Sequence, residues 1–184
     1  PAPASRWMGL AARSRLTAAL DARAVQLVLG EIARDGRDRC INVAAATLRA
    51  SDAVVSLTAQ LAAAGQAASH VWVDLPETLA VEHPALVQDL TQRWRPLGVR
   101  VGLEHAGAAL TSIVRLYELG LHYVRIDGRF LAGVARDEAL RRHTEQLVLL
   151  LRGIGLQVFA ETVHDPADLK QLWTMGFHGA TGPA

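Results

Sequence analysis

Six short apolar segments of this sequence end in polar side chains or are followed by them within a few residues. These side chains are Asn42, Asp74 with Glu77, Glu104 with His105, Arg125 with Asp127, Glu161 with His164, and Thr181. Carboxylates bind divalent metals or activate water, and an arginine binds phosphate through two parallel hydrogen bonds. Any one of these residues is explained equally well as a turn cap or a solvated surface group. Polar groups at all six segment ends indicate a shared site.

The segments that position these residues alternate in type along the chain. Apolar runs at 40–45, 70–75, 99–104, 121–126, 156–161 and 177–180 predict strands. Amphipathic spacing predicts helices at 15–33, 51–64, 82–96, from the turn at Gly107 to about 119, at 135–153 and at 165–175. Ser51 with Asp52, and Asp165, are the predicted amino-terminal caps of two of these helices. The alternation predicts an α/β fold with a parallel sheet covered by helices.

Two closures of such a sheet fit the spacing, an open doubly wound sheet and most of a (β/α)8 barrel. No G-x-G-x-x-G loop follows any predicted strand, which argues against the dinucleotide-binding form of the open sheet. A complete barrel takes about 250 residues. Six units in 184 residues therefore fit a barrel that lacks its first units. The carboxyl ends of barrel strands converge on one mouth, where the polar residues would share a cavity.

Bulk composition limits the classes of function. A chain of 184 residues with 51% hydrophobic and 20% charged residues predicts a single globular domain over 1–184. A net charge of +1 gives no reason to expect a nucleic-acid partner. The single cysteine, Cys40, excludes an internal disulfide framework and fits a reducing compartment. No apolar run reaches the roughly 18 residues that span a bilayer.

The order of the motifs resembles the EAL domain, the cyclic di-GMP phosphodiesterase fold. INVAAATL resembles the family's VNLS segment and places Asn42 at its asparagine, and WVDLPE resembles LEITE, with Asp74 and Glu77 at its two glutamates. GLEHAG stands where the family has LDDFG, RID where it has KID, and AETVH where it has AEGVE. The resemblance implies a TIM-like barrel of EAL type whose first two strands, with the Glu-Ala-Leu signature, we expect to be missing from this chain. It also places Trp7 in a segment that borders the nucleotide pocket.

Several positions depart from the family's pattern. Its two adjacent aspartates are Glu104 and His105 here, its lysine is Arg125, its second EGVE glutamate is His164, and its first LEITE glutamate is Asp74. Imidazole is a poor ligand for magnesium, and an arginine stays protonated and accepts no proton. We therefore expect no divalent metal cofactor and no catalysis.

The resemblance implies that the residues that remain bind cyclic di-GMP. The expected ligand-binding residues are Asn42, Glu77, Glu104, Arg125, Asp127, Glu161, Thr181, Gly182 and Pro183, with Trp7, Asp74, His105 and His164 beside the ligand. The ending FHGATGPA and the segment WVDLPE resemble LapD-type receptors, which bind cyclic di-GMP without cleaving it.

A LapD-type receptor implies a particular cellular setting. We expect a homodimer through this domain, neighbouring GGDEF and HAMP-type modules, and a periplasmic protease as the output partner in control of biofilm adhesion. The domain would lie on the cytoplasmic side of a bacterial inner-membrane protein. Two other hypotheses stay open: an active metal-dependent phosphodiesterase with Glu77, Glu104 and Glu161 as metal ligands, and an interaction scaffold that binds no nucleotide.

Overall fold

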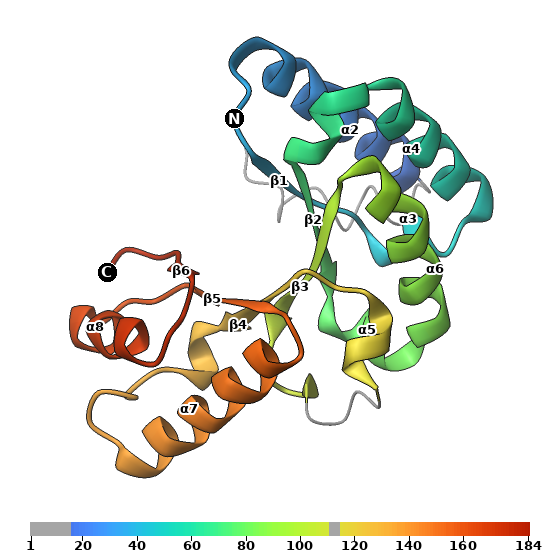
Figure 1. Ribbon diagram of the computed structural model, residues 1–184. Helices are drawn as coiled ribbons and strands as arrows, with labels where there is room; N and C mark the ends of the chain where they lie inside the picture. Colours follow the sequence, from blue (N-terminus) through green and yellow to red (C-terminus); the bar gives the residue numbers. More distant parts are fainter. Residues whose placement is uncertain (1–15, 111–114) are drawn as a thin grey trace. The chain divides into compact units, whose positions relative to one another are not determined.

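The computed structural model describes residues 16–110 and 115–184, in which strands and helices alternate as predicted (Figure 1). The strands are β1 (Arg39–Asn42), β2 (Val71–Pro76), β3 (Arg100–Ala106), β4 (Tyr123–Asp127), β5 (Gln157–Glu161) and β6 (Gly179–Ala180). The α-helices are α2 (Thr17–Asp35), α3 (Ala45–Leu48), α4 (Ser51–Ala63), α5 (Glu77–Glu82), α6 (Pro84–Trp94), α7 (Glu138–Gly153) and α8 (Pro166–Thr174).

The strands stand in the order β1-β2-β3-β4-β5-β6, so their order in the sheet follows the chain. Strand β1 pairs with β2, β3 with β4, β4 with β5, and β5 with β6, each in parallel. An open doubly wound sheet reverses its strand order at a switch point, whereas a barrel keeps the order of the sequence. The strand order therefore favours the barrel alternative, and the predicted α/β fold with a parallel sheet is confirmed.

The chain divides into two compact units, residues up to 75 with 92–100, and residues 76–91 with 101–184. The prediction of one domain over 1–184 stays a prediction. In the first unit, α2 and α4 lie side by side and pack near β1 and β2 (Figure 1). Its core includes Val25 and Ile32 of α2, Leu57 and Leu61 of α4, and Val71 and Val73 of β2.

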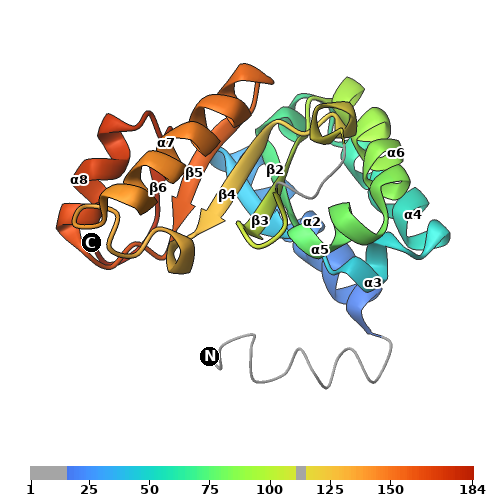
Figure 2. The same ribbon diagram turned by 90° about the horizontal axis from the view of Figure 1, so that it is seen from below.

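The second unit holds strands β4 to β6 and most of β3. Helix α7 lies along β5 (Figure 2) and buries Val148 and Leu151. Asp137 and Asp165 accept backbone N–H groups at the starts of α7 and α8, so the predicted Asp165 cap is confirmed. The buried Asp168 accepts the N–H groups of Gly133 and Ala135 at 2.8 and 2.9 Å. Residues 131–136 therefore form turns, and α7 starts three residues later than predicted.

Three helix predictions were wrong in detail. The helix predicted at 82–96 starts only at Pro84, as α6, because His83 has non-helical backbone angles and a proline disfavours a helical predecessor. The short helix α5 before it was not predicted. The cap of α4 is Ala50, without a side-chain hydrogen bond, so the predicted Ser51–Asp52 cap was wrong. In the helix predicted from Gly107 to about 119, the described residues form bends at 107–109, 3-10 geometry at Leu110 and a 3-10 helix at Leu116–Leu119. Residues 111–114 lie outside the described part.

Candidate functional site

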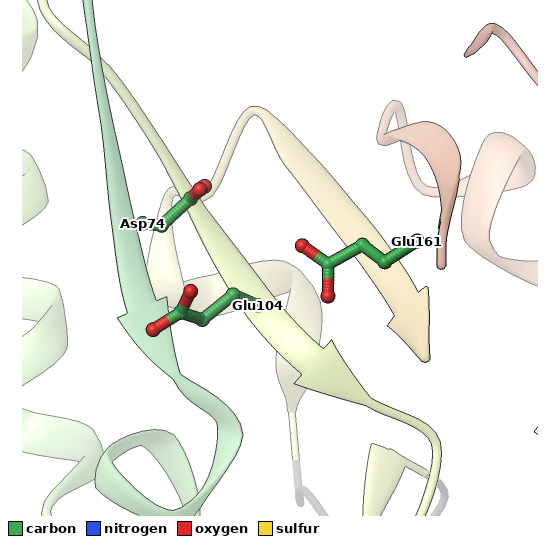
Figure 3. Close-up of side chains that lie close together, drawn as sticks. All are labelled: Asp74, Glu104 and Glu161. Carbon is green, nitrogen blue, oxygen red and sulfur yellow. The ribbon is translucent and has the colours of Figure 1, made fainter. Parts of the chain in front are cut away.

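Three carboxylates come together at the ends of strands β3, β4 and β5 in the second unit. Asp127 and Glu161 are paired residues at the ends of β4 and β5. Glu161 ends β5, and Figure 3 shows its carboxylate pointing toward that of Glu104; carboxylate oxygens of the two lie within 4.8 Å of each other. All three side chains are at most 14% exposed. Because burial penalises a charged carboxylate, each of them needs polar partners.

His105 lies among these three carboxylates. Its Nδ1 atom is 3.2 Å from Oε2 of Glu161 and 3.8 Å from Oδ2 of Asp127, and its Nε2 atom is 3.8 Å from Oε2 of Glu104. Its backbone N–H also donates to Oε2 of Glu161 at 3.0 Å. The imidazole is 61% exposed, so it covers the carboxylates from the solvent side.

A backbone irregularity brings Glu104 and His105 to the same place. Neighbouring strand residues normally point to opposite faces of a sheet. Here the register between β3 and β4 shifts between Leu103 and Ala106, and His105 has a φ of 51°. A bulge of this kind changes the direction of a side chain. Here it requires His105 to adopt a backbone conformation that residues other than glycine rarely adopt. The sequence signal for the bulge is weak, because it depends on the register with β4.

Arg129 is a site residue that the sequence analysis missed. Its Nε and Nη2 atoms donate to Oδ2 of Asp127 at 3.0 and 2.8 Å, and its backbone N–H donates to Oδ1 at 2.9 Å. These side-chain hydrogen bonds hold the pKa of Asp127 below its ordinary value, against the opposing effect of burial. The spacing Asp-x-Arg directly after a strand was the available signal. Asp127 is therefore already neutralised by a guanidinium group.

Glu77 contacts the loop after β3. Its Oε1 atom accepts the backbone N–H groups of Gly107 and Ala109 at 3.0 and 3.1 Å, and the residue is only 6% exposed. Glu77 is the first residue of α5, so a short helix and a buried carboxylate fix the start of this loop. The structure thus gives Glu77 a loop-positioning contact, and its predicted role as a ligand-binding residue stays a prediction.

Two of the expected site residues belong to the first unit. Asn42 and Asp74 are register partners at the ends of β1 and β2. Asp74 is 5% exposed and accepts a hydrogen bond from Sγ of Cys40 at 3.0 Å, whereas Asn42 is exposed. The thiol contact was not anticipated, although the alternation of β1 puts positions 40 and 42 on one face.

The remaining expected residues lie at or beyond the ends of β5 and β6, apart from Trp7 and Arg125, which is on β4 two residues before Asp127. His164 is exposed beside a cavity of about 240 Å³ that Thr162, Arg136 and Asp165 also line. The carbonyl of Thr181 accepts the N–H of Val163 at 2.8 Å. At Gly182 a side chain would overlap the backbone of Val163, so this close approach requires glycine. Thr181, Gly182 and Pro183 are exposed, and Trp7 lies outside the described residues.

The whole chain apart from its first residue matches one protein family, the EAL domain, over residues 2–184. The chain belongs to the EAL domain family. Its curated relatives include the cyclic di-GMP phosphodiesterase PdeB of Shewanella oneidensis, 30% identical over 117 residues, which are 62% of this chain and 13% of that protein. An uncharacterized protein of Azorhizobium caulinodans is 25% identical over 142 residues, 77% of this chain and 19% of that protein. The chain thus spans under a fifth of the length of both relatives.

Solved EAL structures share the fold. The phosphodiesterase PaMucR in a cyclic di-GMP complex gives a TM-score of 0.84 at 19% identity, over 97% of this chain and 75% of that one. The FimX EAL domain of Xanthomonas citri with cyclic di-GMP gives 0.83 at 20% identity, over 97% and 73%. The S helix-GGDEF-EAL protein LapD of Vibrio cholerae, bound to cyclic di-GMP, gives 0.88 at 16% identity, over 98% and 45%. The predicted EAL type of fold is confirmed. No helix in the described part of the EAL domain is long and apolar enough to cross a membrane.

Proposed function

We propose that this EAL domain binds cyclic di-GMP and does not hydrolyse it. The observation that carries the proposal is the place of His105 among the carboxylates of Glu104, Asp127 and Glu161, at 3.2 to 3.8 Å. Magnesium and its relatives prefer oxygen ligands, and imidazole is a poor substitute for a carboxylate in such a site. Asp127 is bound by Arg129, and Glu161 accepts the backbone N–H of His105, so both carboxylates already have nitrogen partners from this chain. This donor set fits a two-metal hydrolytic centre poorly.

The same residues suit the binding of a cyclic dinucleotide. Arg125 lies on β4, two residues before Asp127. A guanidinium group can bind a phosphodiester through two N–H groups in one plane. A guanidinium group stays protonated and cannot take a proton from an attacking water. Glu104 and Glu161 can accept hydrogen bonds from the N–H groups of guanine. Cyclic di-GMP is the ligand in the solved PaMucR, FimX and LapD structures, which supports this choice.

The receptor setting is part of the proposal. Tyr117 and Leu150, 63% and 60% exposed, line an apolar cavity of about 170 Å³ in the second unit, and Leu149 of the same helix as Leu150 is 67% exposed. Exposed apolar groups gathered in this way suit a protein interface, so we place the homodimer contact here. GGDEF and HAMP-type neighbours, a position on the cytoplasmic side of an inner membrane and a periplasmic protease as output partner follow from the resemblance to LapD-type receptors. Ligand binding would shift the equilibrium between two arrangements of these modules.

An active phosphodiesterase is the second candidate. The observation in its favour is the Glu104–Glu161 carboxylate pair, with oxygens within 4.8 Å. A turnover assay separates the two candidates. The full-length protein is incubated with cyclic di-GMP and millimolar Mg²⁺ or Mn²⁺, and the linear dinucleotide is quantified by chromatography. We expect no product above the no-enzyme control, whereas metal-dependent product would establish the phosphodiesterase instead.

A further inference from the structure

The guanidinium group of Arg125 lies against two aromatic rings. Its central carbon is 5.2 Å from the ring centroid of Tyr123 and 5.6 Å from that of Phe159. Both distances are within the range of a cation–π interaction. Tyr123 precedes Arg125 by two residues on β4, and Phe159 is its register partner on β5. The arginine is therefore contacted by aromatic rings from its own strand and from the next one.

The two rings are themselves fixed in place. They meet edge to face, with centroids 6.0 Å apart and planes at 89°. Gly102 of β3 is the register partner of Tyr123, and any side chain there would overlap the tyrosine ring. Gly179 of β6 is the register partner of Phe159, and a Cβ atom there would lie 2.7 Å from the phenylalanine ring. Two glycines on neighbouring strands thus make the room that this aromatic pair occupies.

Tyr123 and Phe159, together called the aromatic floor, restrict the conformations of the Arg125 side chain. An arginine side chain has many rotamers and loses this freedom when it binds an anion. Contact with both rings restricts the guanidinium before any ligand arrives, so less entropy is lost on binding. Asp127, two residues further along the same strand face, is bound by Arg129. Arg129 thereby neutralises the carboxylate that follows Arg125 on β4.

We infer that Tyr123 and Phe159 are positioning residues that hold Arg125 ready for the phosphodiester of the ligand. The inference rests on the proposed function, because it assigns these rings to the same ligand site. The inference also explains why position 125 holds an arginine. A planar guanidinium group can stack on aromatic faces and bind phosphate through two N–H groups at once. The rings act through the arginine and touch no ligand themselves in this role.

A double-mutant cycle tests the role of the floor. Cyclic di-GMP affinity is measured by calorimetry on the full-length protein with Phe159→Leu, Arg125→Ala and both changes together. We expect Phe159→Leu to weaken binding about five- to twentyfold when Arg125 is present, as the loss of a cation–π contact implies. In the Arg125→Ala background the same change should alter affinity less than about twofold, because coupled residues are not additive.

The outcomes separate this inference from the proposed function. An equal loss from Phe159→Leu in both backgrounds would show that the ring acts only through the fold, while ligand binding itself stands. No binding by the unmodified protein would overturn the proposed function together with the role of the rings. Phe177→Leu removes a buried ring elsewhere in the same unit and should lower the unfolding temperature without changing affinity. If Phe159→Leu fails to fold, side-chain ¹⁵N relaxation of Arg125 in the unmodified protein gives the answer: an ordered Nε supports the inference and a mobile one overturns it.

Discussion

The Nδ1 atom of His105 lies 3.2 Å from Oε2 of Glu161, and the backbone N–H of His105 donates to the same oxygen at 3.0 Å. One residue thus contacts one carboxylate oxygen from both its ring and its main chain. The β3 bulge makes this possible, because it turns His105 to the side on which Glu104 and Glu161 meet. One carboxylate oxygen of Glu161 therefore already has two nitrogen partners from the same residue.

Replacing His105 by aspartate should raise the affinity for divalent metal. Aspartate tolerates the left-handed backbone at this position and would add a third hard oxygen ligand. We expect His105→Asp to bind Mn²⁺ at least about tenfold more tightly than the unmodified protein, as a new carboxylate ligand implies. Calorimetric titration with MnCl₂ measures this.

The matched control for that substitution is His105→Asn, which accepts the same backbone angles but carries no charge. It should leave Mn²⁺ binding as weak as in the unmodified protein. Equal Mn²⁺ affinity in the unmodified protein and in His105→Asp would contradict the idea that the site binds metal weakly because position 105 lacks a carboxylate.

Truncating Glu77 should loosen the loop after β3. Glu77→Ala leaves the N–H groups of Gly107 and Ala109 without their buried acceptor, and each hydrogen bond to a charged group contributes about 1.5–3 kcal/mol. We expect the free energy of unfolding to fall by about 2–4 kcal/mol in urea titrations. Amide exchange at Gly107 and Ala109 should accelerate selectively.

Glu82→Ala is the control for this loss, because Glu82 lies on the same short helix and is exposed. It should change stability by no more than about 0.5 kcal/mol. If both substitutions destabilise equally, or if the two amides stay protected in Glu77→Ala, the loop contact has no energetic role.

The Asp127–Arg129 pair predicts a specific pH dependence. The folded-state pKa of Asp127 is lowered, so the pair stabilises the fold above the unfolded value of about 3.9 and loses this effect as pH falls through the folded value. Arg129 is 78% exposed, so solvent screening keeps the stabilisation by this pair small.

Unfolding free energies of Arg129→Gln and the unmodified protein between pH 2.5 and pH 7 check this prediction. The difference between them should be largest at neutral pH and shrink as pH falls below the unfolded-state pKa of about 3.9 and through the lower folded-state pKa of Asp127. A difference that grows on acidification has the wrong sign for this account. Arg142→Gln, which removes an exposed helical pair with Glu138, serves as the comparison.

Strand periodicity made part of the site predictable. A period of two places Tyr123, Arg125 and Asp127 on one face of β4, and parallel strands bring Asp127 beside Glu161. The Asp165 cap was also readable, because aspartate before proline and a helical pattern is a common start of a helix. These features follow from local chemistry along the chain.

The rest of the site depends on register and on loops. The bulge at His105 arises between two strands, and no residue of β3 alone specifies it. The contact from Glu77 to Gly107 joins residues 30 positions apart through a loop whose shape had no periodic signal. The aromatic floor under Arg125 needs glycines on two other strands, so it emerges only when β3, β4, β5 and β6 are paired.

The affinity of the full-length protein for cyclic di-GMP, measured by calorimetry in excess EDTA and again in Mn²⁺, tests the central claim most directly. We predict the same dissociation constant in both, within about twofold, and a loss of at least about thirtyfold in Arg125→Ala, since a truncated charge-assisted contact costs 2–5 kcal/mol. Binding that disappears in EDTA and returns with Mn²⁺ would contradict a metal-independent receptor site built around His105 and Arg125.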